Sequence, residues 1–492
     1  MAAYVLEAGR NTPDKNALQI LSVTGAERWS YAALTRAVKG IGTGFLQAGL
    51  RPGDRVLLRL ANTVDFPLAF LGALAVGLVP IPTSSQLTAA EITAMAAQVD
   101  PAAVIAAPDV ARPDHPAPVF TVDALREWRK LPECEWAMGN PNRLGYMIFT
   151  SGTSGRPRAV MHAHRAVWAR RMMWADWYGL TTNDRLLHAG AFNWTYTLGT
   201  GLMDPWAIGA TALIPGQGTQ PIQLPLLLKR FDATIFAAAP GVYRQLLKSP
   251  VLSMPKLRHG LSAGEKLPEA TRRAWSDATG TPVFEALGMS EVSTYVSSGP
   301  LRPVAEGSSG YAQSGRRIAV LGPDDTPVAR HEAGILAVGD DDPGLFLGYF
   351  GAADETRSRF AKGWFKTGDT VSMDSDGAIR YLGRDDDIMN AGGYRVSPLE
   401  VERAFDDLPG ISESAAVELP VKRGVSVIGL FYVPTQEPVP EGMLTQHAEA
   451  VLARYKQPRI FVAMRDLPKG ANNKLNRRAL RTGWKGQDDH ET

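Results

Sequence analysis

TSGTSGRPRAV (residues 150–160) directly follows an apolar run at residues 146–149. The stretch brings three Gly or Pro residues, four hydroxyl side chains and two arginines together. Glycines let backbone N–H groups turn towards an anion, and hydroxyls and arginine add further donors. The spacing of its glycines differs from that of GxxxxGK[ST], another Gly-rich pattern that binds phosphate. The stretch therefore predicts a phosphate-binding loop behind a buried strand, with a plain surface turn as the alternative.

The composition of the chain excludes several classes of protein. A chain of 492 residues with 45% hydrophobic and 21% charged residues is expected to be globular and to form at least two domains. The net charge of only +2, without a basic tract, argues against nucleic acid as the main partner. The first residues lack the order of a signal peptide, and no run reaches the ~20 apolar residues of a membrane span. We therefore expect a cytoplasmic protein, in which the lone Cys134 is a packed thiol.

The first 300 residues alternate short apolar runs with helix-length segments. This alternation predicts parallel sheets covered on both faces, a doubly wound α/β fold. Ligands of such folds bind at loops that leave the carboxyl ends of strands, and we assign residues 150–160 to such a loop. The pattern also predicts one helix over residues 163–179. The expected strands include residues 54–62, 185–191, 211–216, 233–239 and 258–264.

Two changes in the sequence pattern divide the rest of the chain. From about residue 307, short apolar runs between Gly, Asp and Pro predict an antiparallel, β-barrel-like module. Beyond the charged residues 384–387, helix and strand patterns predict a small, mobile α+β domain. We expect an N-terminal domain over residues 1–384 and a C-terminal lid domain over residues 385–492.

Five stretches of the sequence together resemble the adenylate-forming superfamily, which includes acyl-CoA synthetases, peptide-synthetase adenylation domains and luciferases. TSGTSGRPRAV is similar to that superfamily's phosphate loop, [ST]SGTTGxPKxV. Four further signatures follow in the superfamily's order over some 330 residues, which makes the resemblance specific. They are ALGMSE (286–291), WFKTGD (364–369), GRDDDIMNAGGYRVSPLEVE (383–402) and LPKGANNKLNRRALR (467–481). The overall pattern is nearest to benzoate- and medium-chain acyl-CoA ligases.

The resemblance implies a two-step reaction with ATP, Mg²⁺ and coenzyme A. The carboxylate of an acid attacks the α-phosphate of ATP to give an acyl-adenylate and pyrophosphate, and the thiol of coenzyme A then displaces AMP. Catalysis would come from positioning and charge stabilisation, without a protein nucleophile. Lys474 matches the lysine that stabilises the charge between carboxylate and α-phosphate, and Arg395 matches an arginine on the phosphate side.

The resemblance also assigns residues to the nucleotide. Arg158 stands where the superfamily usually has lysine, and Glu291 matches the Mg²⁺ ligand. Leu287 replaces an aromatic ring beside adenine, and Glu285 replaces an aspartate at the adenine edge. The implied phosphate-binding residues are Thr150, Ser151, Gly152, Thr153, Ser154, Gly155, Arg158 and Ser290. The implied adenine- and ribose-binding residues are Gly264, Glu265, Glu285, Ala286, Leu287, Asp369 and Arg384.

Because Lys474 belongs to the second domain, the resemblance implies that this domain closes for adenylation and then rotates. Asp386 matches the hinge position. Gly392 and Gly393 would then face a pantetheine tunnel, or they form a simple turn. Asn473 replaces the usual glycine beside Lys474.

The resemblance assigns the acyl pocket to residues 192–199, to Ala263 and to the turn at residues 287–289. Gly288 stands where acetate-specific enzymes carry tryptophan. A glycine leaves room for an aromatic or medium-length acyl group, although Trp194 and Tyr196 would instead shrink the pocket or belong to the core. Asn193 lacks the charge that would pair with the ammonium of an amino acid, which disfavours amino-acid substrates. The expected pocket residues are Asn193, Trp194, Thr195, Tyr196, Ala263 and Gly288.

Three functions remain open at this point. The first is a free-standing acid–CoA ligase, whose partners are a small carboxylic acid, ATP and coenzyme A. The second is an acid-adenylating enzyme that loads a separate carrier protein or makes an amide. The third is a nucleotide- or acyl-binding protein without catalysis, which the replacements at Arg158, Leu287 and Asn473 keep open. A homodimer is one option for its assembly.

Overall fold

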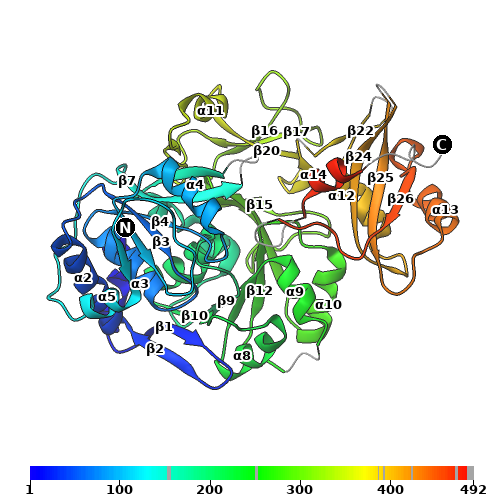
Figure 1. Ribbon diagram of the computed structural model, residues 1–492. Helices are drawn as coiled ribbons and strands as arrows, with labels where there is room; N and C mark the ends of the chain where they lie inside the picture. The colour runs from blue at the N-terminus through cyan, green and yellow to red at the C-terminus, as the bar shows by residue number, and fades with distance from the viewer. Residues whose placement is uncertain are drawn as a thin grey trace.

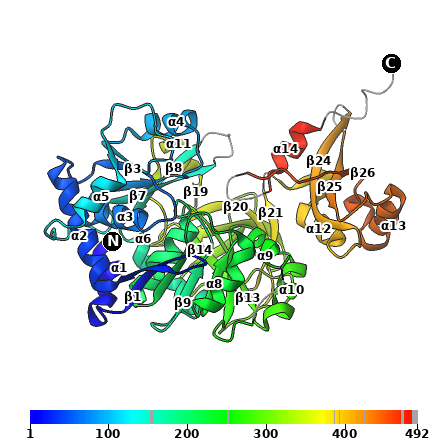
Figure 2. The same ribbon diagram turned by 60° about the horizontal axis from the view of Figure 1, so that its bottom comes forward.

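The computed structural model describes residues 1–151, 157–249, 253–385, 387–391, 394–422, 425–470 and 475–484. The N-terminal part contains two sheets with helices on their faces, followed by a β-rich module (Figure 1). A smaller C-terminal unit stands to one side of this body, as a second direction of view also shows (Figure 2). The expected α/β architecture is therefore confirmed.

The larger sheet has nine strands in the order β15-β14-β13-β12-β11-β9-β10-β1-β2. The six strands from β13 to β1 are parallel, and antiparallel strands complete both edges. The inner strands are short runs that are buried on both faces, as parallel sheets require. The strands are β1 (Asn16–Leu21), β2 (Ala26–Ser30), β9 (Arg185–His188), β10 (Thr211–Pro215), β11 (Ile235–Ala238), β12 (His259–Ala263), β13 (Val283–Met289), β14 (Ser293–Ser297) and β15 (Tyr311–Ala312).

A second sheet of four parallel strands has the order β4-β3-β5-β6. One apolar core contains α1, α2 and α3 together with side chains of both sheets, so these helices lie between the two sheets. The far face of the larger sheet packs on α8, α9 and α10, and that of the smaller sheet on α4. The strands are β3 (Arg55–Arg59), β4 (Val79–Pro82), β5 (Ala103–Ala106) and β6 (Val119–Thr121). The helices are α1 (Ala2–Glu7), α2 (Tyr31–Gln47), α3 (Asp65–Ala75), α4 (Ala89–Val99), α5 (Val122–Trp128), α7 (Asp204–Ile208), α8 (Leu224–Arg230), α9 (Pro240–Leu246) and α10 (Glu269–Thr279).

The opening stretch of the sequence lies in an antiparallel hairpin. β7 (Leu144–Ser151) runs into β8 (Pro157–Ala163), and β18 (Gly348–Tyr349) pairs with the outer side of β8. The prediction that this loop leaves a strand of a parallel sheet was therefore wrong. An apolar run before a Gly-rich loop fits a hairpin strand as well as a parallel one, so the sequence pattern could not distinguish them.

The predicted single helix over residues 163–179 is broken. It consists of α6 (Ala166–Ala169), a turn at Arg170 and a π-helical segment, Trp174–Tyr178. Arg170 turns its side chain into the core to meet Asp204, and the wide turn lets the adjacent rings of Trp177 and Tyr178 both become buried. Such π segments are rare and occur often beside functional sites.

The β-rich module is confirmed as an antiparallel sheet in the order β16-β17-β20-β19, with β21 paired to β20. The helix α11 (Ala353–Ser358) precedes β19 in this module. The register sets Asp369 opposite Arg384 where β20 and β21 pair. The strands are β16 (Ile318–Leu321), β17 (Ala333–Gly339), β19 (Phe360–Ala361), β20 (Trp364–Met373) and β21 (Ile379–Arg384).

The C-terminal unit mixes helices and strands, as expected. β24, β25 and β26 form one sheet, and β22 pairs with β23 in a small hairpin. Among the residues that the structure describes, Arg273 pairs with Asp407 at 3.2 Å and Arg244 with Glu413 at 3.6 Å, and both pairs link this unit to the N-terminal body. Its elements are β22 (Met389–Ala391), β23 (Tyr394–Val396), α12 (Pro398–Phe405), β24 (Ile411–Lys422), β25 (Val425–Pro434), α13 (Glu441–Val451), β26 (Ile460–Ala463) and α14 (Arg477–Gly483).

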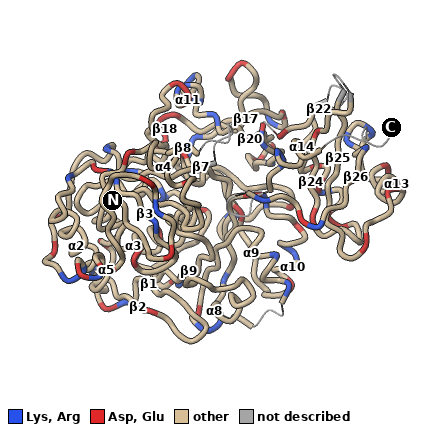
Figure 3. The backbone as a smooth tube through the Cα atoms, viewed as in Figure 1, with Lys and Arg blue, Asp and Glu red and all other residues tan. Residues whose placement is uncertain are grey.

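Charged residues of both signs are interspersed along the chain, in keeping with the small net charge (Figure 3). Within the described ranges, none of the helices combines the length and the apolar character that crossing a bilayer requires.

A buried ion pair fixes α14 inside the C-terminal unit. The guanidinium of Arg477 donates to both carboxylate oxygens of Glu402 on α12, at 2.7 and 2.8 Å. The same carboxylate accepts a hydrogen bond from the amide of Ala416, at 2.8 Å. Arg477 also lies 3.9 Å from Asp387, in the segment that joins the two units. The residues after Lys474 are therefore fixed to both the small unit and its connection.

We predict that Glu402→Ala lowers the free energy of unfolding of the C-terminal unit by about 3 kcal/mol, because it removes the anion nearest to the half-buried Arg477 and leaves only the more distant Asp387. Amide hydrogen exchange of peptides that cover residues 475–484 measures this loss as faster exchange. Glu449→Ala, an exposed position on α13, is the matched control. Unchanged protection of residues 475–484 in Glu402→Ala would contradict the assignment.

Candidate functional site

The centre of the site is a carboxylate held between two strands and two tyrosines. Asp369 Oδ1 accepts from Arg384 Nη1 at 3.1 Å, across the β20–β21 pair. The Asp369 carboxylate also accepts from the hydroxyls of Tyr295, at 3.2 Å, and Tyr381, at 3.5 Å. Burial raises the pKa of Tyr295 well above its ordinary value, so its hydroxyl keeps the proton that it donates. The structure thus brings together Asp369 and Arg384, which the sequence predicted as ribose-binding partners.

A second carboxylate lies where three segments of the chain meet. Glu291 is buried, and its Oε1 accepts from the hydroxyl of Tyr349 at 2.7 Å. Tyr349 pairs with Val160 of β8, and its ring lies 5.9 Å from the guanidinium of Arg158. The strand after the predicted phosphate loop, the ALGMSE turn and β18 therefore meet around one tyrosine.

The carboxylate of Glu291 is suited to a hard cation by its chemistry. One hydrogen bond from Tyr349 uses only part of the acceptor capacity of a carboxylate, and Mg²⁺ prefers carboxylate and phosphate oxygens. Among the described residues, no group of three or more His, Cys, Asp or Glu side chains is arranged to hold a metal. A cation here would therefore need oxygen ligands from a bound phosphate as well.

Arg158, predicted to bind phosphate, forms an ion pair with Glu355 of α11. Both side chains are half-buried. The positive charge is thus present beside the predicted loop, but an acidic partner already faces it. The sequence reasoning missed Glu355, because nearly 200 residues separate it from Arg158.

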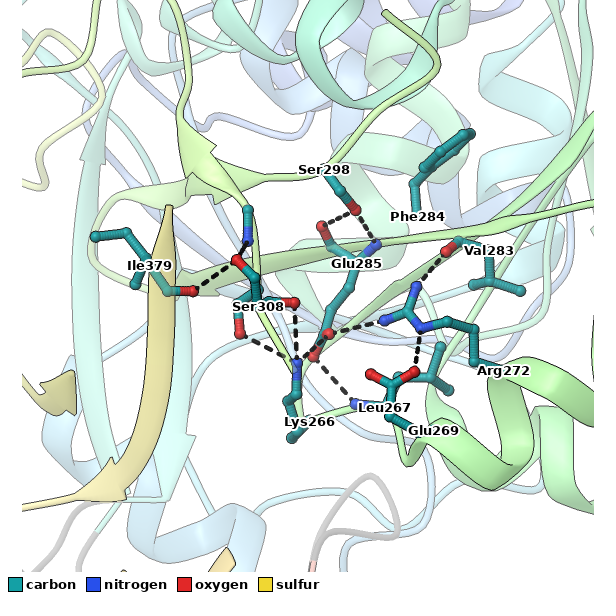
Figure 4. Close-up of polar contacts among 12 residues, drawn as sticks. Lys266, Leu267, Glu269, Arg272, Val283, Phe284, Glu285, Ser298, Ser308 and Ile379 are labelled. Carbon is teal, nitrogen blue, oxygen red and sulfur yellow. Dashed lines mark hydrogen bonds and ion pairs between the residues drawn. The ribbon is translucent and has the colours of Figure 1, made fainter. Parts of the chain in front are cut away.

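Glu285 anchors the segment that follows β12, where the sequence predicted an adenine contact. Its carboxylate accepts from Lys266 Nζ at 2.7 Å, from Arg272 Nη2 at 3.1 Å and from the amide of Leu267 at 3.0 Å (Figure 4). Lys266 Nζ also contacts Ser309 Oγ at 3.2 Å. Because both carboxylate oxygens are engaged, Glu285 holds the 264–267 segment in place.

The neighbouring residues of this motif are placed by packing. Gly264 has a φ of +100°, in the region that favours glycine, which lets the chain turn at the end of β12. Ala286 and Leu287 are buried in β13, Leu287 in the same apolar cluster as Tyr295 and Tyr349. Glu265 is half-buried beside Lys266. A role of these residues in binding adenine stays a prediction.

The predicted acyl-pocket residues divide between the core and a small cleft. Tyr196 is buried, donates its hydroxyl to the carbonyl of Leu261 at 3.1 Å, and packs with Ala263 in one apolar cluster. Trp194 lies edge-on to Tyr196, with ring centroids 5.1 Å apart. Thr195 and Ser290 instead line a cleft between the β7–β8 hairpin and the turn after β13. Asn193, before Trp194, is half-buried.

Gly288 has a local reason to be glycine. A Cβ at this position would lie 2.7 Å from the carbonyl oxygen of Ser293 and 2.8 Å from Cα of Thr294. These backbone atoms of β14 approach Gly288 at a register irregularity between Leu287 and Gly288. Backbone atoms of β14 therefore occupy the space that a Cβ atom at residue 288 would need. The sequence argument that Gly288 leaves room for the acyl group did not consider this close contact with β14.

Several predicted residues lie outside the described part of the chain. They are Gly152, Thr153, Ser154, Gly155, Asp386, Gly392, Gly393, Asn473 and Lys474. Thr150 and Ser151 end β7, where they pair with Arg158 and Pro157. Arg395 belongs to β23. The roles assigned to all these residues stay predictions.

We predict that Glu285→Ala lowers the free energy of unfolding by about 3 kcal/mol or more, because it leaves Lys266 and Arg272 without their buried anion. Urea unfolding of the purified protein measures the loss. Glu306→Ala, which removes an exposed carboxylate near Arg273, is expected to change stability by less than about 0.5 kcal/mol. Equal stability of the two variants would contradict the anchoring role of Glu285.

The family model described as AMP-binding enzyme matches residues 5–350, and the one described as AMP-binding enzyme C-terminal domain matches residues 400–474. A 3-hydroxybenzoate–CoA ligase of Aromatoleum sp. (strain CIB) is 27% identical, over 93% of this chain and 92% of that protein.

Among solved structures, ATP-bound MatB from Rhodopseudomonas palustris has a TM-score of 0.89 at 25% identity, covering 98% of this chain and 99% of that one. A benzoate CoA ligase from Burkholderia xenovorans LB400 has a TM-score of 0.86 at 26% identity, with the same coverage. These matches extend over nearly the whole chain, and the first family model alone covers more than half of it. The chain therefore belongs to the family of AMP-binding enzymes, as its five signatures predicted.

Proposed function

We propose that this chain is an ATP-dependent carboxylic acid–CoA ligase that acts on an aromatic or medium-chain acid. The observation that carries this proposal is the convergence of three predicted motifs: Tyr349 joins Glu291 to the β8 strand of Arg158, and Tyr295 joins β14 to Asp369. The named relatives, which include CoA ligases of hydroxybenzoate and benzoate, support the same chemistry.

The first step would join the acid to AMP. A carboxylate oxygen of the acid forms a bond to the α-phosphorus of ATP, and the bond from that phosphorus to the pyrophosphate oxygen breaks. Asp369 would accept hydrogen bonds from the ribose hydroxyls, while Arg384 and the two tyrosines keep its carboxylate in place. Glu291 would hold Mg²⁺ against the phosphates, where the ion neutralises part of their charge. Lys474 would stabilise the charge between the carboxylate and the α-phosphate.

The second step would transfer the acyl group to sulfur. The thiol of coenzyme A loses its proton, its sulfur attacks the acyl carbon, and AMP leaves with the original carboxylate oxygen. Residues 385–492 would form a lid domain that turns about Asp386 and places Gly392 and Gly393 beside the incoming thiol. The two family models match on either side of this boundary, which supports it. Mg²⁺ binding, a homodimer and a cytoplasmic location stay predictions from the sequence.

A panel of acids tests the proposed function. Acetate, hexanoate, octanoate, benzoate and hydroxybenzoates are each supplied with ATP, Mg²⁺ and coenzyme A, and AMP, pyrophosphate and thioester are measured. The proposal requires all three products with at least one aromatic or medium-chain acid. Pyrophosphate without thioester would favour the loading of a carrier protein instead. Acid-dependent pyrophosphate release no greater than that of Lys474→Ala would favour a binding protein without catalysis.

We predict that Lys474→Ala slows acyl-adenylate formation by about 10²–10³-fold, by analogy with the loss of a donor that stabilises transition-state charge. Supplied acyl-adenylate should still give thioester at a rate close to wild type, because the lysine would withdraw before that step. Rapid-quench measurement of the two half-reactions checks this. Lys469→Ala, which removes one of the two described partners of Glu413 and leaves Arg244, is the matched control. Equal slowing of both half-reactions would contradict the assignment.

We predict that Arg158→Leu raises the KM for ATP about 10-fold, because one charge-assisted contact with phosphate is lost. Glu355→Gln removes the competing carboxylate and should leave this KM unchanged or lower it. Steady-state kinetics at saturating acid and coenzyme A measure both variants. Arg357→Leu, on the exposed side of α11, is the control. An unchanged KM for ATP in Arg158→Leu would assign the Arg158–Glu355 pair to structure alone.

A further inference from the structure

The turn between β13 and β14 carries Ser290 and Glu291, the residues assigned to the phosphates and to Mg²⁺. Met289 pairs with Ser293 across the two strands, so these two residues close the turn. From the segment before β18, the amide of Phe346 donates to the backbone carbonyl of Glu291 at 2.8 Å. The other side of the turn depends on Ser293, which stands two residues after Glu291.

Ser293 has to be held in place because its backbone is strained. Its φ of +80° lies in the left-handed region that non-glycine residues rarely adopt, and such conformations persist only where the surroundings fix them. Its hydroxyl oxygen accepts from Nη1 of Arg170, and its hydroxyl donates to the sulfur of Met173 at 3.9 Å, a weak acceptor. Of these two contacts, the one with the guanidinium of Arg170 is the stronger.

Arg170 is itself fixed by Asp204, the first residue of α7. Its Nε and Nη2 donate to the two carboxylate oxygens of Asp204, at 2.9 and 2.6 Å, and both side chains are buried. Nη2 also lies 3.3 Å from the hydroxyls of Tyr178 and Thr200. Gly199 leaves room for the guanidinium, since a Cβ there would lie 2.1 Å from its central carbon. The guanidinium is therefore held in the orientation that directs Nη1 to the turn.

The partners of this guanidinium come from two unusual elements. Its hydroxyl partners belong to the π-helical segments Trp174–Tyr178 and Thr197–Met203, and Asp204 directly follows the second. Such segments are rare and occur often at functional sites. A buried ion pair often contributes no net stability relative to apolar side chains of similar volume, so stability alone does not explain this pair. Both points favour a role in positioning.

Arg170 supports the turn from behind and does not reach a substrate. The cleft that it lines together with Ser290 and Ser293 has room for about one water molecule, and neither an acyl group nor a phosphate fits there. Asp204 balances the charge of the guanidinium where the two side chains meet. The pair therefore supplies a donor behind the proposed Mg²⁺ site without the repulsion that an unpaired arginine would exert on a cation.

We infer that Arg170 is a positioning residue for Glu291. Held by Asp204, it fixes Ser293, and through this residue it sets the direction of the Glu291 carboxylate towards Mg²⁺ and the phosphates. The inference rests on the proposed function, in which Glu291 holds Mg²⁺, and it adds the buried groups that keep this carboxylate in place. Residues that orient a metal ligand typically contribute 10- to 100-fold to metal affinity.

The test removes both charges of the pair together, so that no buried charge is left alone. In Arg170→Met/Asp204→Asn the volumes stay similar, and the new amide can still bond to the hydroxyls of Tyr178 and Thr200. Isothermal titration calorimetry of the full chain, without acid, measures the Kd of α,β-methylene-ATP, once with excess Mg²⁺ and once with EDTA. We expect the gain in affinity due to Mg²⁺ to fall about 10-fold, with the Kd in EDTA changed less than 2-fold.

Two further variants separate positioning from folding. Ser293→Gly removes the hydroxyl and accepts the positive φ, and it should lower the Mg²⁺-dependent gain at least 5-fold. Arg129→Met/Asp65→Asn removes a comparable ion pair between the start of α3 and the end of α5, with side chains 16% and 7% exposed. This control should change both Kd values less than 2-fold. Thermal unfolding of each variant reports on the fold.

The outcomes that overturn the inference are distinct. An unchanged Mg²⁺-dependent gain in Ser293→Gly would overturn it even if the double variant of Arg170 does not fold. Equal weakening of binding with Mg²⁺ and with EDTA, or the same loss in the Arg129 control, would assign the Arg170–Asp204 pair to the fold alone. An unchanged gain in Glu291→Gln would overturn the inference together with the Mg²⁺ assignment. None of these results removes the ligase function, which fails only if no acid gives AMP and thioester.

Discussion

The ion pair between Asp369 and Arg384 connects the predicted nucleotide site to the joint between the two units. β20 and β21 set the two residues opposite each other, and Arg384 is the last residue of β21, directly before the connection. A nucleotide whose ribose binds Asp369 would therefore contact the start of the segment about which the C-terminal unit is proposed to turn. Occupancy of the site and the position of the small unit would then be coupled through this pair.

A similar linkage is found on the predicted phosphate side of the site. Tyr349 donates to Glu291 and pairs with β8, so the turn after β13 cannot move without moving the strand of Arg158. The turn then continues into Ser293, whose hydroxyl meets the buried Arg170–Asp204 pair. Only Val292 thus separates the Glu291 carboxylate, which would serve the phosphates, from the Ser293 hydroxyl beside the Arg170–Asp204 pair.

The sequence predicted the fold class, the division into two units and the pairs that one motif or two neighbouring strands bring together. Asp369 and Arg384 are examples, because both belong to signatures with assigned roles. The partners that fix these residues were not predicted. Tyr349 and Glu291 are 58 residues apart, and Glu355 and Arg158 are farther still; such contacts depend on strand pairing, which no local pattern encodes.

Two other differences have local causes. The helix predicted over residues 163–179 breaks because Arg170 turns inward to Asp204, a contact with a residue 34 positions away. Glu285 looked available to a ligand because its partners Lys266 and Arg272 resemble ordinary surface residues in the sequence. A lysine directly before the buried Leu267, with Arg272 in the first turn of α10, is a signal that could have indicated the network.

The central claim is that the oxygen of the acid becomes bonded to the phosphorus of AMP. The most direct measurement supplies a carboxylic acid labelled with ¹⁸O in its carboxyl group, together with ATP, Mg²⁺ and coenzyme A, and determines the isotope content of the AMP by mass spectrometry. The account predicts one ¹⁸O atom in the phosphate of each AMP formed. Unlabelled AMP, formed alongside the thioester, would contradict it.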